Sequence, residues 1–425
     1  MTNKMSMKKI DLHFLCATTL LAIMLISCNS KAPYRSLTKS ITYNHQSSFS
    51  APITGVYHIN DSCSRIFFTI NTGSLLYIKK TSGTTFAAHY RAHYELHPFD
   101  EPNNLQDSGT FEYSDTLFFN KTADILDSFD IGGLRSKKYT LNLTITDLNK
   151  KSEIETGIVL LRDDPHSRQN FCIRSATGAL INQEVLQPGQ DISVTTNNKN
   201  LFRLCVRYYR SDYPIALPPF LENRELAYSL KPDSAFLIDL ENGTSTLLRL
   251  KSNSIYHFQS DTTQKEGLTL FTFYEGFPKV TTAEQMLAPV RYISTKNEFN
   301  DLKMMKNAKH AVDEFWLDKA GTVERAKEMI VRYYNRVQDA NKYFTSYLEG
   351  WKSDRGMIYI VFGPPQALYK SATQETWVYG EDRNILSTTF TFNKVNNQFS
   401  DNDYSLERSA EYKDTWYTAV ETWRK

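Results

Sequence analysis

The sequence lacks an excess of charge of either sign, and it lacks the short motifs of common enzyme folds. Its 49 lysines and arginines nearly balance 47 aspartates and glutamates, so the formal net charge is +2. Proteins that bind nucleic acid through a broad basic field carry a large positive excess, and we predict no nucleic-acid partner. P-loop, Gly-x-Ser-x-Gly, His-Glu-x-x-His and dinucleotide-binding glycine motifs are missing. We therefore predict no cofactor and favour a non-enzymatic role.

Long apolar runs are also scarce, and the clearest one lies near the start of the chain. Three lysines precede an apolar stretch at residues 14–26, which is the order of charged and apolar regions in an export signal. The stretch is too short to span a bilayer, which takes about 20 apolar residues. It ends in the sequence LISC, which resembles the lipobox of bacterial lipoproteins. We predict that residues 1–27 are removed as a signal peptide and that lipid, including palmitate, is attached to Cys28.

Two other interpretations of this segment are an uncleaved helical anchor and ordinary cleavage at an Ala-x-Ala site. Two or three acyl chains would hold the mature chain durably, because each buried methylene contributes about 0.8 kcal/mol. Cleavage takes away three lysines and Asp11, which leaves 46 basic and 46 acidic residues. Residues 28–50 are polar and rich in serine, as is typical of a tether between a lipid and the first domain.

Short alternating apolar runs, separated by turn clusters, fill residues 51–163 and again residues 168–276. Successive side chains of a strand point to opposite faces, so this pattern predicts half-buried strands. A polar break that contains proline separates the two stretches. The spacing predicts two consecutive all-β sandwich domains. The sequence LRSKKYTL at residues 134–141 resembles the tyrosine corner of immunoglobulin-like domains, which makes these sandwiches candidates for that fold.

Near residue 280 the apolar period changes from about 2 to about 3.6, which predicts helices. Helical spacing covers residues 298–315 and 322–348, and Thr295 with Glu298 has the spacing of a capping box. Gly350 follows the second run, where a left-handed helix cap is expected. The remaining pattern predicts an α+β domain at residues 277–425, with strands at 357–362, 376–379, 388–392 and 404–406 and a closing helix at 409–423.

The sequence GWKSDRG, followed by IYI and GPP, resembles the signature of the GWxTD domain family of Bacteroidetes lipoproteins. The resemblance covers roughly residues 275–425 and includes flanking aromatic pairs such as Phe315-Trp316 and Glu375-Thr376-Trp377. Ser353 stands where the family has threonine, which keeps the hydroxyl and loses a methyl group. The family carries no established activity. The signature residues are Gly350, Trp351, Ser353, Asp354, Arg355, Gly356, Gly363, Pro364 and Pro365.

We interpret the signature as a corner between a helix and a strand. Trp351 would pack behind the strand at 357–362, Ser353 and Asp354 would accept backbone N–H groups, and Gly356 would adopt a positive φ. The GPP sequence would then end the strand. An alternative is a partner-binding surface anchored by the exposed side chain of Arg355. A catalytic role for Asp354 is least favoured, because no base or nucleophile is tied to it by spacing.

Two sets of side chains resemble metal or redox sites. His89, His93 and His97 have helical chelating spacing, but they alternate with apolar residues as in a strand, where residues four apart lie about 13 Å from each other. We therefore predict no metal site. After lipidation three cysteines remain, so at most one internal disulfide can form. Cys172 and Cys205 are the candidate pair, and an unpaired state is the alternative.

These observations leave two classes of function. The first is a non-enzymatic scaffold or adaptor in an envelope assembly or secretion machine, with envelope proteins as partners. The second is a surface carbohydrate-binding or hydrolytic lipoprotein, which requires a cleft with paired carboxylates or an aromatic platform. The residues just after Cys28 lack the acidic cluster that resembles the surface-export signal of Bacteroidetes lipoproteins. We therefore predict an outer-membrane lipoprotein that faces the periplasm.

Overall fold

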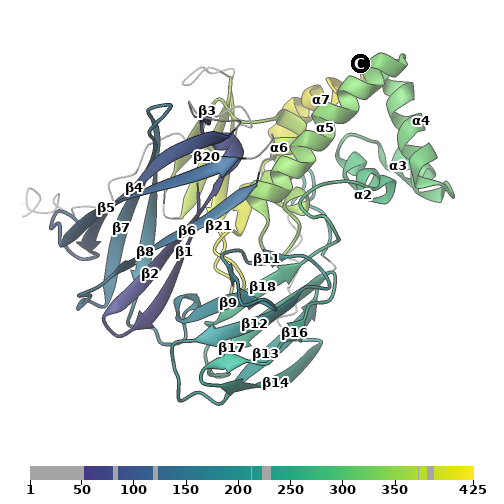
Figure 1. The fold of residues 1–425 in the computed structure, drawn as a ribbon. Coiled ribbons are helices and arrows are strands. Elements are labelled where there is room, and N and C mark those ends of the chain that lie inside the picture. Colours follow the sequence, from purple (N-terminus) through teal and green to yellow (C-terminus); the bar gives the residue numbers. More distant parts are fainter. Residues whose placement is uncertain are drawn as a thin grey trace, which may run out of the picture.

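The chain has two β-rich parts followed by a part that contains most of the helices (Figure 1). The predicted order, with sheets first and an α+β segment last, is confirmed. The predicted signal peptide, Cys28 and the tether at residues 28–50 lie outside the described residues. The computed structural model describes residues 52–79, 85–117, 123–211, 213–222, 231–371, 373–380 and 387–425.

The first part consists of two sheets around one apolar core that includes Phe68 and Leu143. One sheet has the strand order β1-β2-β6, and the other has the order β3-β4-β7-β8 with β5 on β4. The Tyr139 hydroxyl accepts hydrogen bonds from the backbone N–H groups of Arg135 (2.8 Å) and Ser136 (2.7 Å), as in a tyrosine corner. The strands are β1 (Ile53–Asn60), β2 (Cys63–Asn71), β3 (Ile78–Lys79), β4 (Phe86–Pro98), β5 (Asp107–Leu117), β6 (Asp124–Ile131), β7 (Lys138–Asp147) and β8 (Ser152–Leu161).

The second part has ten strands, nine of them in one continuous path, around its own core, which includes Phe171 and Phe258. The order is β10-β9-β12-β15-β14-β13-β17-β18-β11, with β16 on β12. The strands are β9 (Phe171–Ser175), β10 (Leu180–Ile181), β11 (Val185–Leu186), β12 (Asp191–Thr196), β13 (Arg203–Arg210), β14 (Ser234–Glu241), β15 (Thr244–Ser245), β16 (Leu248–Arg249), β17 (Ser254–Gln259) and β18 (Leu268–Thr272).

In the C-terminal part, α-helices and the four-stranded sheet β19-β20-β21-β22 share the largest core of the chain. The Thr295 and Glu298 capping box is confirmed at the start of α3. The elements are α2 (Ala283–Leu287), α3 (Lys296–Met304), α4 (Ala308–Ala320), α5 (Val323–Phe344), α6 (Asp354–Phe362), α7 (Tyr412–Glu421), β19 (Ala367–Lys370), β20 (Gln374–Tyr379), β21 (Thr388–Lys394) and β22 (Tyr404–Leu406), with short 3-10 turns at Ala288–Tyr292 and Gly350–Lys352.

Two predictions for this part are wrong. The expected strand at 357–362 belongs to helix α6, in which every residue from Arg355 to Val361 is buried. A helix that is buried on all sides has no apolar stripe, so its sequence resembles that of a buried strand. The expected continuous helix at 298–315 is divided into α3 and α4, because the side chain of Asn307 caps a new helix by accepting the His310 N–H.

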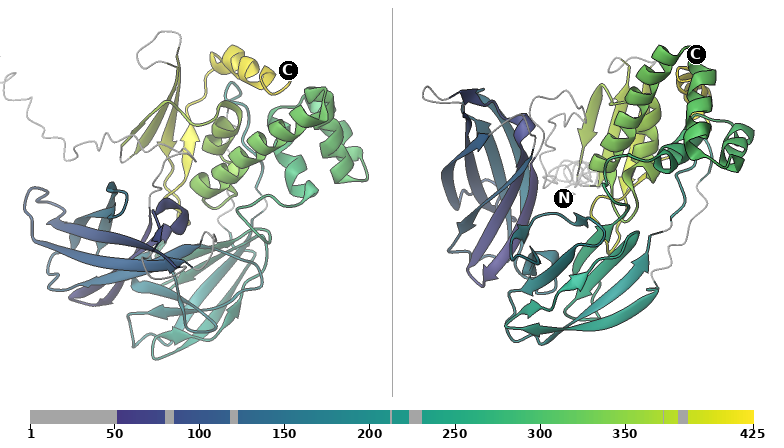
Figure 2. Two further views of the ribbon diagram at one scale, coloured as in Figure 1. Left: turned by 45° about the horizontal axis from the view of Figure 1, so that its top comes forward. Right: turned by 45° about the vertical axis from the view of Figure 1, so that its right-hand side comes forward.

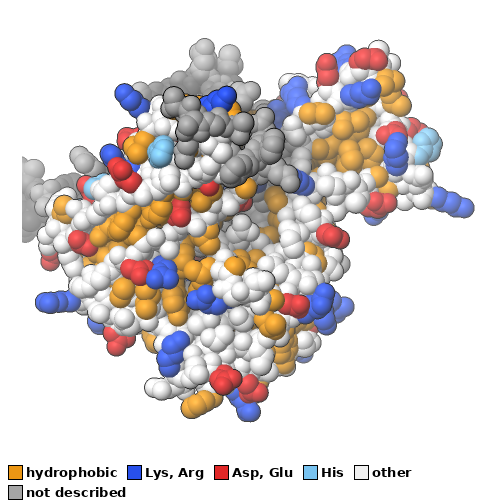
Figure 3. Space-filling view, in the orientation of Figure 1, with side chains coloured by type: hydrophobic (Ala, Val, Ile, Leu, Met, Phe, Trp, Pro, Cys, Tyr) orange, Lys and Arg blue, Asp and Glu red, His pale blue; other side chains and the backbone are white. Residues whose placement is uncertain are grey.

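The three parts are joined by direct contacts, with the helices at one end of the molecule (Figure 2). Tyr209 of β13 and Phe399 of the C-terminal part meet edge to face at 4.9 Å between ring centroids, within an apolar cluster that both parts build. Asn182 of the second part donates to the Ile53 carbonyl of the first part. Charged side chains of both signs are interspersed on the face in Figure 3. Within the described ranges, no helix is both long and apolar enough to span a bilayer.

Candidate functional site

The signature residues lie at a sharp junction between helices α5 and α6. A 3-10 turn at Gly350–Lys352 leads into Ser353, which caps α6. The Ser353 hydroxyl accepts the Gly356 N–H at 3.0 Å and donates to the Gly350 carbonyl at 2.7 Å. Ser353 thus accepts a backbone N–H, as predicted, but it does so as the cap of a helix and not in a turn before a strand.

Gly350 and Gly356 are needed for close packing and not for a positive φ, so both predicted roles are wrong. Helix α5 ends at Phe344, with Thr345 as its cap. A Cβ atom on Gly350 would lie 1.9 Å from the Ala340 carbonyl oxygen, and one on Gly356 would lie 1.9 Å from the Gly350 carbonyl oxygen. Real Cβ atoms do not approach so closely, so these two glycines allow the backbones of α5, the turn and α6 to touch.

Trp351 is buried, as predicted, and its polar atoms are satisfied within the corner. Its indole N–H donates to the Glu349 carboxylate. Its carbonyl accepts the Tyr292 hydroxyl at 2.9 Å, and its backbone N–H donates to the Asn341 side chain at 3.1 Å. The side chain belongs to the main core of the C-terminal part, so it fastens the corner to the elements on both sides.

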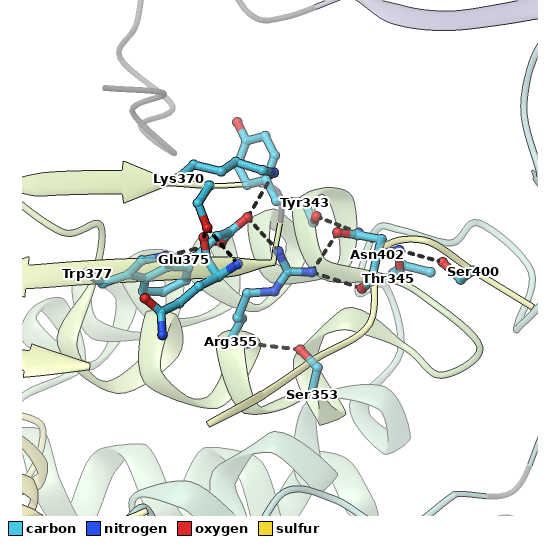
Figure 4. Close-up of polar contacts among 12 residues, drawn as sticks. Tyr343, Thr345, Ser353, Arg355, Lys370, Glu375, Trp377, Ser400 and Asn402 are labelled. Atoms are coloured by element: carbon cyan, nitrogen blue, oxygen red, sulfur yellow. Dashed lines mark hydrogen bonds and ion pairs between the residues drawn. The ribbon is translucent and has the colours of Figure 1, made fainter. Parts of the chain in front are cut away.

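Arg355 is buried and ion-paired, so the prediction of an exposed partner anchor is wrong (Figure 4). Its Nη1 lies 3.2 Å from Glu375 Oε1, and its Nη2 donates to the carbonyl (2.9 Å) and side-chain oxygen (2.6 Å) of Asn402. The guanidinium stands 4.1 Å from the centroid of the Tyr404 ring, close enough for a cation–π contact. The long side chain is rarely buried unless paired, and here its partner lies twenty residues further along the chain.

Glu375 accepts from two cations and from an indole. Lys370 Nζ lies 2.9 Å from its Oε1, and the Trp377 indole N–H donates to its Oε2 at 3.3 Å. Burial alone raises the pKa of Glu375, but the charges of Arg355 and Lys370 outweigh burial and hold that pKa below its usual range. Glu375 therefore stays ionised inside the domain and neutralises Arg355.

Asp354 connects the corner to β22 and to the second part of the chain. Its Oδ2 accepts the Leu406 N–H at 2.9 Å, and its Oδ1 pairs with Arg408. Burial raises the pKa of Asp354, although the Arg408 charge acts in the opposite direction. Arg408 in turn donates to the carbonyls of Leu217 (2.7 Å) and Pro218 (2.8 Å). The signature carboxylate thus holds an arginine that binds main chain from the second part.

The sequence model of the GWxTD domain family matches residues 254–425 of this chain. Residues 254–425 contain a GWxTD domain. The match begins at the first residue of β17, so it includes two strands of the second sheet that the expected boundary at residue 277 leaves out. No protein of curated function matches the chain.

The GPP sequence of the GWxTD domain ends helix α6. Gly363 has a φ of 91° and its N–H bonds to the Tyr359 carbonyl. Arg336 of α5 donates to the carbonyls of Ile360 (3.0 Å) and Val361 (3.2 Å), and a Cβ on Gly363 would lie 2.7 Å from its Nη2. Because Gly363 has no side chain, Arg336 can reach the carbonyl groups at the end of α6. Pro364 and Pro365 then prevent the helix from continuing.

A pocket of about 250 Å³ lies against the corner of the GWxTD domain. Its lining includes Asp354, Asp403 and Arg408, beside apolar side chains such as Tyr347. Burial raises the pKa of Asp403 to about 6, with Asp354 contributing and the Asn397 hydrogen bond opposing. Arg408 Nε is buried and has no hydrogen-bond partner in the described part of the chain. The pocket therefore combines two carboxyl groups with an arginine.

A larger cleft of about 680 Å³ opens where the three parts of the chain meet. The ion pair of Arg168 and Glu184, at 3.2 Å, lines one side. Lys265 from the turn between β17 and β18, together with residues 395–402 of the GWxTD domain, lines the rest. The junction of the three parts thus leaves a polar cleft.

The other candidate residues lie away from the corner. His89, His93 and His97 lie along strand β4, which confirms the strand prediction. Cys63, Cys172 and Cys205 are free thiols, so the structure does not contain the Cys172–Cys205 bridge. In the sheet, β12, β15 and β14 separate the strands that carry these two cysteines. Burial raises the pKa of the Cys172 thiol.

Sequence reasoning missed Glu375, Asp403 and Arg408. Glu375 was noted only as part of a flanking aromatic motif, and its pairing with Arg355 depends on a contact between α6 and β20. Arg408 lies 54 residues beyond Asp354. The available signal is that Glu375 lies two residues before Trp377 and so on the same face of β20, where a buried charge requires a partner.

Proposed function

We propose that the protein is a non-enzymatic scaffold or adaptor of the bacterial envelope, belonging to the GWxTD lipoproteins of Bacteroidetes. In this proposal lipid on Cys28 anchors the chain to the outer membrane on the periplasmic side, and two immunoglobulin-like sandwiches carry the GWxTD domain away from the membrane. Its partners are envelope proteins of an assembly or secretion machine.

One observation carries the scaffold role: the polar groups of the signature are bonded to other parts of the same chain. Asp354 holds Arg408, and Arg408 binds the main chain of the second part. Arg355 is neutralised by Glu375. Residues used in this way join two parts of one chain, as the residues of an adaptor do.

Metabolic labelling tests the anchor. Wild-type protein should incorporate a palmitate analogue, and Cys28→Ala should incorporate none and accumulate as precursor. Cys63→Ala is the matched control, because Cys63 lies in the mature chain and should not affect labelling. Label on Cys28→Ala would contradict the lipid anchor.

Cross-linking on intact cells tests the adaptor role and the orientation. Protease added outside should spare the protein, and cross-linked partners purified with wild type should be envelope proteins. The same partners should be lost with Cys28→Ala. Rapid shaving of the protein while periplasmic markers stay intact would place it on the surface, and purification without any specific partner would argue against an adaptor.

The pocket beside the corner favours a second candidate, a hydrolytic or carbohydrate-binding lipoprotein. Asp354 and Asp403 line this pocket together, and a carboxyl with a pKa of about 6 suits general acid catalysis near neutral pH. Incubation of the purified protein with cell-wall and capsular polysaccharides would then release new reducing ends. Asp403→Asn should abolish the release and Lys370→Ala should not.

A further inference from the structure

A segment of the second part lies on the GWxTD domain next to the signature. We call residues 213–222, with the sequence YPIALPPFLE, the strap. The strap belongs to the connection between β13 (Arg203–Arg210) and β14 (Ser234–Glu241). It forms one wall of the pocket at the corner, while the signature and β22 form the others.

Main-chain hydrogen bonds hold the strap in place. The Ala216 N–H donates to the Lys352 carbonyl at 2.9 Å, and the Ser409 N–H donates to the Pro219 carbonyl at 3.3 Å. Between them, Arg408 donates to the carbonyls of Leu217 and Pro218. Four consecutive residues of the strap are therefore bound through backbone atoms, so these bonds do not depend on the identity of their side chains.

Aromatic contacts add side-chain selectivity at both ends of the strap. Tyr213 meets Tyr347 edge to face at 4.8 Å between ring centroids. Phe220 lies 5.6 Å from the ring of Tyr417 on helix α7, and Pro219 between them is buried. The strap turns at this point, because the Leu221 N–H donates to the Pro218 carbonyl at 3.1 Å. The preferred occupant is thus a segment in which two prolines and the following aromatic residue form a turn. Proline restricts the free segment, which lowers the conformational entropy lost on binding.

The signature residues build this seat. Lys352 supplies the carbonyl that accepts the strap N–H. Asp354, fixed by the Leu406 N–H, orients Arg408 so that its Nη1 reaches two successive carbonyls. Asp354 is a positioning residue in this arrangement, because it acts on the peptide through Arg408.

We propose that the corner of the GWxTD domain is a binding seat for peptides with a Pro-Pro-aromatic turn, that the strap occupies it in cis, and that a partner protein's segment of the same chemistry replaces the strap. A tethered ligand is present at a millimolar effective concentration, so a partner must compete with it. This inference deepens the proposed adaptor function by naming its docking site. Peptide binding in solution does not depend on the lipid anchor or on cellular location, so the two proposals can fail separately.

The test uses the full-length lipoprotein in detergent and a fluorescent peptide with the sequence of residues 213–222. Fluorescence anisotropy should show at least tenfold tighter binding to Phe220→Ala than to wild type, because the weakened strap competes less. Adding Arg408→Gln to Phe220→Ala should remove this binding, and a scrambled peptide should not bind. A folded Phe220→Ala protein that binds the two peptides equally would overturn the proposal.

A reversible disulfide tests the proposal if Phe220→Ala does not fold. The pair Phe220→Cys and Tyr417→Cys, oxidised, should fix the strap in its seat and prevent peptide binding, and reduction should restore it. Unchanged binding after oxidation would contradict the seat. Size-exclusion chromatography tests a third outcome. If the protein binds no peptide and forms a dimer that is lost when the disulfide forms, the seat binds a second copy of this chain. That result would overturn the assignment to a partner protein.

Discussion

The guanidinium of Arg355 and the carboxylate of Glu375 face each other at 3.2 Å, and neither side chain is more than 1% exposed. Removing one member of such a pair leaves an uncompensated buried charge, which costs about 3–5 kcal/mol. Arg355→Ala should therefore unfold the GWxTD domain at a much lower temperature. Lys309→Ala, which breaks an exposed pair with Asp313 on α4, should cost less than about 1 kcal/mol.

Denaturant titrations of the full chain would measure both changes. Arg355→Met combined with Glu375→Leu should recover a large part of the lost stability, because a buried ion pair is often replaceable by apolar side chains. An Arg355→Ala protein as stable as wild type would show that the pair contributes nothing to stability.

Trp351→Ala should cost about 3–5 kcal/mol, because it removes a large buried side chain and leaves a cavity. It also leaves the Glu349 carboxylate without its indole N–H donor. Thermal melts followed by near-ultraviolet circular dichroism would report this loss. Tyr417→Ala is the control, since that ring is about half exposed and its removal should have a smaller effect. Equal melting temperatures for the two variants would refute the packing role of Trp351.

Ser353→Ala should destabilise the GWxTD domain by about 1 kcal/mol, because α6 loses its N-cap acceptor. Ser353→Thr keeps the hydroxyl and restores the residue that is typical of the family, so its stability should remain within about 0.5 kcal/mol of wild type. Chemical denaturation of the three proteins decides the question. A Ser353→Ala protein as stable as wild type would show that the cap does not stabilise α6.

Asp403 should make the domain less stable as the pH rises. Its pKa is raised from 3.8 to about 6, so the folded state binds a proton more tightly than the unfolded state does. Stability should then fall by about 3 kcal/mol between pH 4 and pH 6 and stay level above that range. Asp403→Asn should remove this dependence and be the more stable protein at pH 7.5. Parallel pH profiles for wild type and Asp403→Asn would contradict the raised pKa.

The sequence identified most elements, and its two failures have different causes. Strands such as β7 and the long helix α5 show a clear period because one face of each is more exposed than the other. Helix α6 is buried on all sides, so its sequence carries no such period and was assigned to a strand. The break between α3 and α4 depends on a single capping residue, Asn307, inside an otherwise helical pattern.

The sequence predicts which residues form the corner, but not the contacts that they make with distant parts of the chain. Ser353 capping and Trp351 burial follow from local chemistry, and both are found. The roles of Gly350 and Gly356 depend on backbones that approach from α5 and from the turn. The burial of Arg355 depends on Glu375, and the task of Asp354 depends on Arg408. Contacts between residues far apart in the chain leave no periodic trace in a single sequence.

The start of the GWxTD match within the second sheet has a consequence for how such a gene segment can be inherited. Strand β17 lies between β13 and β18, so a recombination event at residue 254 would cut through the middle of a sheet. Phe271 and Phe273, behind that cut, pack in the same cluster as Tyr347 and Phe399. A transferred segment would arrive with β17 paired to β18 but with the β17 edge open, so it would need a strand in the new host to replace β13. The heritable unit is therefore larger than the GWxTD match, and it includes the β-rich neighbour that provides the strap.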